Sequence, residues 1–165
     1  NGTVNVEPIL ITDQTRSELN ANLKLYYIGN QRSASGILKE QKKNTAQKEK
    51  YDTLGKMVDL VYDLKDALTQ GKLDDFGSIL HKNWLLKQSL ASGITNQRIN
   101  NFYATALDAG ALGGKLLGAG GGGFMLFYVP VHKQLAVDEA MQQLDAEPFN
   151  FNMETLGSQI IHIES

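Results

Sequence analysis

The chain has 165 residues, of which 42% are hydrophobic, 21% are charged and only three are Pro. This composition is typical of one folded globular domain and excludes a disordered or collagen-like chain. Sixteen basic against 18 acidic side chains give a formal net charge of −2, so no global positive field exists to hold nucleic acid or an anionic membrane.

The absence of Cys excludes a disulfide framework and a thiolate metal site. No early apolar run resembles a signal peptide or a membrane span, and we therefore expect a cytoplasmic protein with no membrane partner. The first residue is Asn1 instead of Met, which leads us to expect that an upstream region is missing. His81, His132 and His162 lack the spacing of metal ligands, so we expect structural or surface roles for them and no metal site.

The N-terminal part predicts a helix followed by a strand. Thr15 and Glu18 have the spacing of a capping box, which predicts a helix start in residues 13–18. Residues 23–28 are rich in Leu and Tyr and predict a strand. We expect this strand to stop at the turn pair Gly29-Asn30.

Four helices are expected in the middle of the chain. Ser33 or Ser35 can cap the first of them, which is expected to run to about Lys43. The other three are predicted by apolar side chains at helical spacing, in residues 54–68, 73–84 and 99–109. Trp84 shares the apolar stripe of its helix, so we expect it in the hydrophobic core.

The C-terminal part predicts strands on both sides of one helix. Residues 124–129 form an unbroken apolar run that is typical of a strand, residues 135–144 suit a helix, and residues 158–163 suit a last strand. Strands separated by bunched helices favour an α+β fold. We expect a ferredoxin-like antiparallel sheet with helices packed on one face and a helical insertion.

A glycine-rich run precedes the strand at residues 124–129. Five of the six residues 118–123 are Gly, and each ordered Gly costs roughly 0.5 to 1 kcal/mol relative to Ala. Such density needs a reason, and two are available: positive φ angles that let successive amides form an anion-binding nest, and close approach of a ligand or another backbone.

Two familiar nucleotide-binding motifs do not fit this run. Gly118, Gly120 and Gly123 match Gly-x-Gly-x-x-Gly, but that fingerprint requires a helix after the glycines, and a strand is expected here. A Walker A loop would need Lys and Ser or Thr where Phe124 and Met125 stand. A tight glycine hairpin without any ligand remains the structural alternative.

Residues 115–124 resemble the third signature motif of the superfamily of galactokinase, homoserine kinase, mevalonate kinase and phosphomevalonate kinase. Residues 26–29, 32–38, 127–130 and 157–159 resemble the branch of that superfamily that phosphorylates heptose phosphates. The resemblance runs in family order from near Ile9 to His162. It implies that residues 1–165 are the C-terminal domain of such a kinase, without the N-terminal domain.

The resemblance also implies a mechanism. The loop of Gly118, Ala119, Gly120, Gly121, Gly122 and Gly123 would face the cleft between the two domains and help to enclose the transferred phosphoryl group. ATP and Mg²⁺ would be bound mainly by the absent N-terminal domain, which also carries the catalytic residues. We therefore expect the isolated chain to be inactive, and the complete enzyme to phosphorylate a sugar or sugar phosphate.

Three further residues are candidates for substrate binding. Arg32 and Ser33 precede a predicted helix, where a guanidinium and helix N-terminal amides can hold a phosphate or sugar oxygen. Lys115 can likewise meet a phosphate. The alternatives are a solvated turn Arg and a Lys that extends along the surface to water.

A second function from a different class stays open at this point. A free-standing ferredoxin-like domain can be a non-catalytic module that senses a ligand or dimerises. Its glycine run would then serve a regulatory ligand or only a tight turn.

Overall fold

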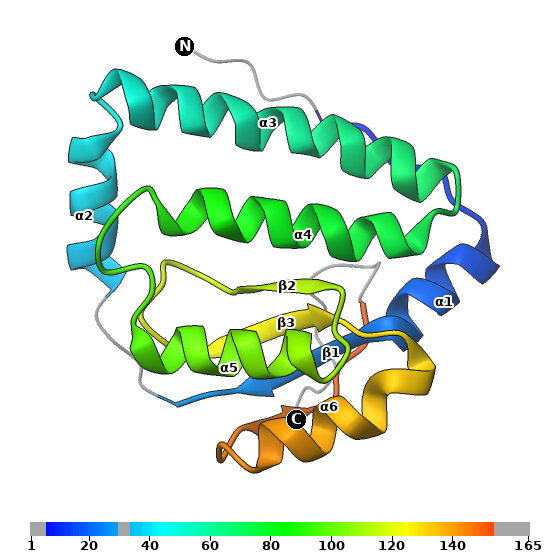
Figure 1. The fold of residues 1–165 in the computed structure, drawn as a ribbon. Coiled ribbons are helices and arrows are strands. Elements are labelled where there is room, and N and C mark those ends of the chain that lie inside the picture. The colour runs from blue at the N-terminus through cyan, green and yellow to red at the C-terminus, as the bar shows by residue number, and fades with distance from the viewer. Residues whose placement is uncertain (1–5, 30–33, 154–165) are drawn as a thin grey trace, which may run out of the picture.

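The computed structural model describes residues 6–29 and 34–153. In these ranges four strands form one antiparallel sheet in the order β2-β3-β1-β4 (Figure 1). Their bounds are β1 Leu23–Tyr27, β2 Gly113–Leu116, β3 Phe124–Tyr128 and β4 Glu147–Phe149. This strand order, with helices between β1 and β2 and between β3 and β4, confirms the predicted α+β ferredoxin-like sheet with a helical insertion.

Six α-helices surround the sheet in the described ranges. They are α1 Asp13–Asn22, α2 Ala34–Asn44, α3 Lys48–Thr69, α4 Leu73–Gln88, α5 Gln97–Asp108 and α6 Gln134–Gln142, and a short 3-10 helix, η1 Val131–Lys133, precedes α6. Helices α5 and α6 cover one face of the sheet, while α4 lies along its β2 edge with α3 beyond it (Figure 1). None of these helices is both long enough and apolar enough to cross a membrane.

The main hydrophobic core fills the space between the sheet and helices α5 and α6. Tyr26 and Phe127 from the sheet meet Phe102 and Val137 from the two helices. Trp84 from α4 is fully buried in the same cluster, which confirms its predicted core position. A smaller cluster lies on the opposite face; its buried members are Leu19, Leu23, Leu68, Leu73 and Tyr128.

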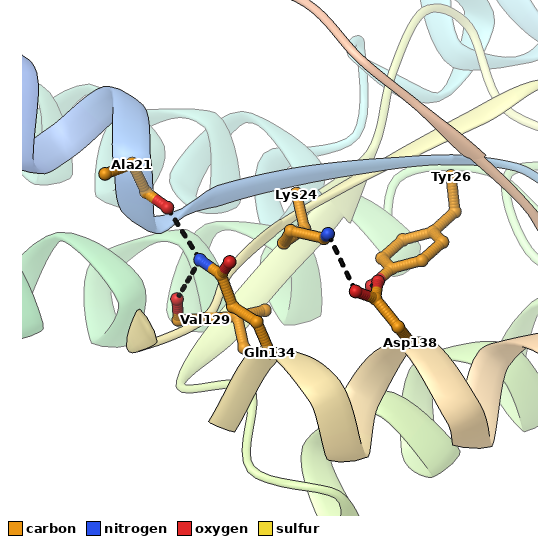
Figure 2. Close-up of polar contacts among 6 residues, drawn as sticks. All are labelled: Ala21, Lys24, Tyr26, Val129, Gln134 and Asp138. Atoms are coloured by element: carbon orange, nitrogen blue, oxygen red, sulfur yellow. Dashed lines mark hydrogen bonds and ion pairs between the residues drawn. The ribbon is translucent and has the colours of Figure 1, made fainter. Parts of the chain in front are cut away.

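Polar contacts fix α6 to β1. The Tyr26 hydroxyl donates to Asp138 Oδ1 at 2.6 Å, and Lys24 Nζ donates to Asp138 Oδ2 at 2.9 Å (Figure 2). The Tyr26 side chain is fully buried, so its hydroxyl depends on this carboxylate for a hydrogen-bond partner. Asp138 therefore aligns the helix with the strand beneath it.

A second contact fixes the start of α6. Gln134 Nε2 donates to the carbonyl oxygen of Ala21 at 2.6 Å and to that of Val129 at 3.2 Å (Figure 2). These carbonyls lie just before β1 begins and just after β3 ends. One side chain thus joins the helix to the same end of both central strands.

The structure corrects two predicted helix caps. Helix α1 is capped by Thr12, whose extended backbone lets its Oγ1 accept the Thr15 N–H at 3.0 Å, so the capping pair begins three residues earlier than predicted. Ser35 lies within α2, after its first residue, and so does not occupy the predicted cap position. Ser33, the other candidate cap, lies outside the described residues.

The structure also contains a strand that was not predicted. Strand β4 pairs with β1 at residues 147–149, whereas the predicted strand at residues 158–163 lies outside the described residues. Sequence reasoning missed β4 because it is short, exposed and contains Pro148. An edge strand tolerates Pro because one side of its backbone needs no ladder hydrogen bonds.

The first glycines of the run serve packing. A Cβ at Gly113 would overlap the carbonyl oxygen of Gly77 in α4, and a Cβ at Gly114 would overlap the carbonyl oxygen of Leu126 in β3. A Cβ at Gly77 would in turn lie 2.8 Å from the Leu112 Cβ. Gly77 and Gly113 therefore allow α4 to lie against the backbone of β2, whereas Gly114 fits against β3.

Candidate functional site: the glycine loop

The glycine loop, residues 118–123, connects β2 to β3 and depends on backbone angles that only Gly adopts readily. Five of its residues have positive φ: Gly118 (80°), Gly120 (114°), Gly121 (83°), Gly122 (149°) and Gly123 (102°). An L side chain is strained in this region because its Cβ crowds the neighbouring carbonyl. The expectation that these glycines supply positive φ is confirmed.

Backbone hydrogen bonds hold the loop between two other segments of the chain. The Gly121 N–H donates to the carbonyl oxygen of Ile94 at 3.1 Å, in the connection between α4 and α5. The Gly123 N–H donates to the carbonyl oxygen of Gly29 at 3.0 Å, and the Ile28 N–H donates to that of Gly123 at 2.9 Å, both at the end of β1. The loop shape is therefore fixed by tertiary contacts on both sides.

The remaining amides of the loop are available to a ligand or to water. Within the described part of the chain, the backbone N–H groups of Gly118, Ala119, Gly120 and Gly122 donate to no protein acceptor. Gly121 is buried, whereas the other loop residues are half-buried or exposed. A fixed loop with unpaired N–H groups is suited to bind an anion, because its donors need no reorganisation.

Space around the loop differs from one glycine to the next. A Cβ at Gly120 would lie 2.7 Å from the Ile94 Cα, so no side chain fits there. Among the described residues, no atom lies within 4 Å of a Cβ placed at Gly118 or Gly123. Packing against Ile94 thus requires Gly at position 120. Beside Gly118 and Gly123 there is space in which a ligand can approach the backbone.

Two lysines lie near the start of the loop. Lys87, in the last turn of α4, donates from Nζ to the Gly118 carbonyl oxygen at 2.6 Å. Burial lowers the pKa of Lys87, and the nearby charge of Lys115 in β2 lowers it further. Burial also lowers the pKa of Lys115. Sequence reasoning missed Lys87, because a Lys in the last turn of a helix is common for other reasons.

Arg98 lies beside Gly29, whose carbonyl oxygen accepts the Gly123 N–H of the loop. It belongs to the first turn of α5, and a Cβ built on Gly29 would lie 3.6 Å from its Nη1. Its guanidinium also lies 5.2 Å from the ring centre of Phe102. Arg98 was likewise not predicted, because only the folded chain brings it near the loop. Arg32 and Ser33 lie outside the described residues, so their roles stay predictions.

Two surface hollows of the described residues lie away from the glycine loop. One of about 490 Å³ is lined by residues 23–25 and 148–152, and another of about 540 Å³ lies beside Tyr128 and Leu73. The glycine loop lines neither of these two. Neither of these hollows encloses the loop, so a second wall would be needed to enclose a ligand there.

The two histidines within the described residues have no metal-binding neighbours. In the described ranges no group of three or more His, Cys, Asp or Glu side chains is placed to hold a metal ion. His81 Nδ1 lies 2.8 Å from the Tyr103 hydroxyl, and the two rings stack, so His81 belongs to the packing between α4 and α5. His132 is exposed in η1, and His162 lies outside the described residues.

Comparison with known proteins shows which family and which relatives the chain resembles. The family model described as "GHMP kinases C terminal" matches residues 64–149, slightly more than half of the chain. The chain is 29% identical to the D-glycero-alpha-D-manno-heptose 7-phosphate kinase of Campylobacter jejuni over 160 residues, which are 96% of this chain and 47% of that protein. It is 34% identical over 115 residues to the L-fucokinase/L-fucose-1-P guanylyltransferase of Bacteroides fragilis, covering 68% of this chain and 12% of that one.

Solved structures show the same fold. A putative sugar kinase from Campylobacter jejuni superposes with a TM-score of 0.59 at 25% identity, over 90% of this chain and 41% of that one. The phosphomevalonate kinase of Streptococcus pneumoniae, in complex with phosphomevalonate and AMPPNP, superposes with a TM-score of 0.65 at 19% identity, over 76% and 37% of the two chains. The chain therefore spans less than half the length of these relatives.

Proposed function

Because the chain belongs to the family of GHMP kinase C-terminal domains, we propose that it is the C-terminal part of an ATP-dependent sugar or sugar-phosphate kinase. The observation that carries the proposal is the glycine loop. Its fixed backbone leaves four N–H groups unpaired within the described part of the chain, as a phosphate-binding loop requires. The kinase's N-terminal domain would supply the second wall.

The loop would act by positioning and by stabilising charge. In the proposed reaction an acceptor hydroxyl oxygen bonds to the γ-phosphorus of ATP while the bond to the β,γ-bridging oxygen breaks, and ADP leaves. Negative charge is spread over the phosphoryl oxygens during this transfer, and preorganised N–H donors stabilise it. Such donors stabilise the charge on the phosphoryl oxygens more strongly when water is excluded. Closure of the two domains over the loop would exclude water.

The other reacting groups are assigned to the N-terminal domain. Mg²⁺ prefers carboxylate ligands, and the described residues hold no group of three or more His, Cys, Asp or Glu side chains placed for a metal ion. The unpaired amides of the loop, in contrast, fit the phosphate chain of ATP. We infer that ATP is held mainly by the N-terminal domain and meets this chain only through its phosphates.

The acceptor is proposed from the relatives. A curated protein that matches 96% of the chain is a heptose 7-phosphate kinase, and two others are fucose kinases fused to a nucleotidyl transferase. We therefore infer that the acceptor is a sugar or, more specifically, a sugar phosphate of the heptose type. The predicted cytoplasmic location agrees with a phosphorylated metabolite as substrate, and it stays a prediction.

The proposal is tested with the complete protein that carries this chain. ADP release is measured with ATP and a panel of heptose phosphates, other sugar phosphates and free sugars. We expect turnover with a sugar or sugar phosphate, and none from the 165-residue chain alone. Ligand binding without ATP consumption across the panel would overturn the kinase and favour the non-catalytic sensing or dimerising module.

A further inference from the structure

Lys87 and Lys115 form a pair of cations at the start of the glycine loop. Lys115 lies in β2, and Lys87 lies in the last turn of α4, which runs along that strand (Figure 1). Both side chains are half-buried. The ion pairs found in the described ranges involve Lys24 and Lys65, so neither of these two lysines has a carboxylate partner there.

Such a pair is unfavourable without an anion. Burial removes water from both ammonium groups, and their like charges repel, which is why the pKa of Lys87 is lowered first by burial and then by Lys115. The Gly118 carbonyl oxygen satisfies one of the three N–H donors of Lys87 and carries only a partial charge. Two partly desolvated donors without an acid beside them are the arrangement that binds phosphate elsewhere in proteins.

The sheet register shows on which face of the sheet Lys115 lies. Lys115 pairs with Leu126, which pairs in turn with Leu25 of β1. Residues opposite each other in a sheet point to the same face, and Leu126 belongs to the cluster on the face that α5 and α6 leave uncovered. Lys115 therefore lies on the face of the sheet opposite α5 and α6, next to the loop.

We propose that Lys87 and Lys115 form a binding site for a phosphate group at the start of the glycine loop, on the face of the sheet opposite α5 and α6. The site deepens the proposed kinase function and rests on it only for the identity of the molecule that carries the phosphate. Two sources share this chemistry, a phosphate already present on the acceptor sugar and the phosphate chain of the nucleotide. Lys87, by its bond to Gly118, would also link the bound phosphate to the loop backbone.

The first experiment measures binding and needs no turnover. Inorganic phosphate and pyrophosphate are titrated calorimetrically into the complete protein and into the variants Lys87→Gln and Lys115→Gln. Each variant is expected to bind the anion about tenfold more weakly or worse, a change of about 1.4 kcal/mol. Lys82→Gln, an exposed Lys of the same helix, is the matched control and should bind as the parent does.

Rescue and folding controls make the result decisive. Lys115→Arg keeps the charge and should restore binding to within about threefold, a cost of well under 1 kcal/mol, whereas a merely structural role for the Lys stem would not distinguish Arg from Gln by anion affinity. Thermal unfolding of each variant identifies any that fails to fold, and two independent positions keep the test available. Unchanged anion affinity in both folded Gln variants would overturn the site.

The second experiment identifies the source of the phosphate. If the acceptor carries it, Lys115→Gln raises KM for the sugar phosphate and leaves KM for ATP and for an unphosphorylated sugar nearly unchanged. If the nucleotide carries it, KM for ATP rises with every acceptor. Absence of kinase activity in the complete protein would contradict the proposed function alone, because the anion titration would still decide the site.

Discussion

The backbone of Gly120 lies against the backbone of Ile94, so closely that a Cβ at position 120 would be 2.7 Å from the Ile94 Cα and 2.9 Å from its carbonyl oxygen. The neighbouring Gly121 N–H donates to that same oxygen. The loop is thus seated on the connection between α4 and α5 by one close contact and one hydrogen bond. Some glycines of the loop are needed for packing and others for the position of the N–H groups, and single substitutions can distinguish these two roles.

Gly120→Ala is expected to destabilise the fold more than Gly123→Ala. Both positions have positive φ, which alone costs about 1 to 2 kcal/mol for Ala. The methyl group added at position 120 must also displace the Ile94 backbone. We therefore expect Gly120→Ala to lower the free energy of unfolding by about 3 kcal/mol in total. Urea unfolding measures both values. Equal losses for the two variants would contradict the contact with Ile94.

Gly118→Ala is expected to reduce turnover more than stability. Its Cβ would meet no described residue within 4 Å, so we expect only backbone strain of about 1 to 2 kcal/mol. If the loop positions a phosphoryl group, a displaced N–H donor costs roughly a hundredfold in kcat. The measurement pairs kcat of the complete enzyme with urea unfolding of the same variant.

Gly55→Ala is the matched control for this loop variant. Gly55 lies within α3, its added Cβ would meet nothing within 4 Å, and Ala is favoured there by about 1 kcal/mol. We expect slightly higher stability and unchanged kcat. A Gly118→Ala enzyme that loses stability and turnover in the same proportion would instead favour a glycine hairpin without a ligand.

Local sequence patterns were sufficient for most of the helices and for the two central strands. Helical spacing of apolar residues predicted α3, α4 and α5, and the apolar runs predicted β1 and β3. The helical pattern predicted more burial along α3 than the structure shows. Val58 and Val61 belong to its apolar stripe, yet they are 55% and 62% exposed. Periodicity indicates an amphipathic face and does not show what covers it.

The elements that the sequence did not predict are those that depend on contacts between distant parts of the chain. Strand β2 contains Gly113 and Gly114, which strand propensity disfavours, and they are present because α4 and β3 lie too close for a side chain. At the site, glycine density predicted the loop itself. The fold brings distant segments of the chain to the loop or to Gly29 beside it, and these segments contribute Lys87, Ile94 and Arg98. Spacing along the sequence cannot predict such neighbours.

Asp138→Ala is expected to destabilise the fold by about 2 to 3 kcal/mol. The change leaves the fully buried Tyr26 hydroxyl without its acceptor and Lys24 without its partner. Asp138→Asn retains an oxygen that can accept from Tyr26, so about 1 kcal/mol is expected for it. Urea unfolding gives both values, and a double-mutant cycle with Tyr26→Phe isolates the hydroxyl. In that cycle additive losses would show that Asp138 and Tyr26 do not interact energetically.

The stability of the fold is expected to fall between pH 10 and pH 12. Burial is the main cause that raises the pKa of Tyr103 and of Tyr128 from 10.0 to about 12. In that interval the unfolded chain releases phenolic protons that the folded chain keeps, so the free energy of unfolding decreases with pH. Below pH 10 both states hold these protons, and the contribution is constant.

Tyr103→Phe tests this alkaline dependence at one of the two phenols. Tyr103 is only 6% exposed, and two pKa units correspond to about 3 kcal/mol. The variant loses the hydroxyl contacts to His81 and Gly114, which lowers stability at every pH by about 1 kcal/mol. It should also flatten the decline above pH 10, as measured by urea midpoints at pH 8 to 12. A decline as steep as that of the parent would mean that Tyr103 ionises near its ordinary pKa in the folded chain.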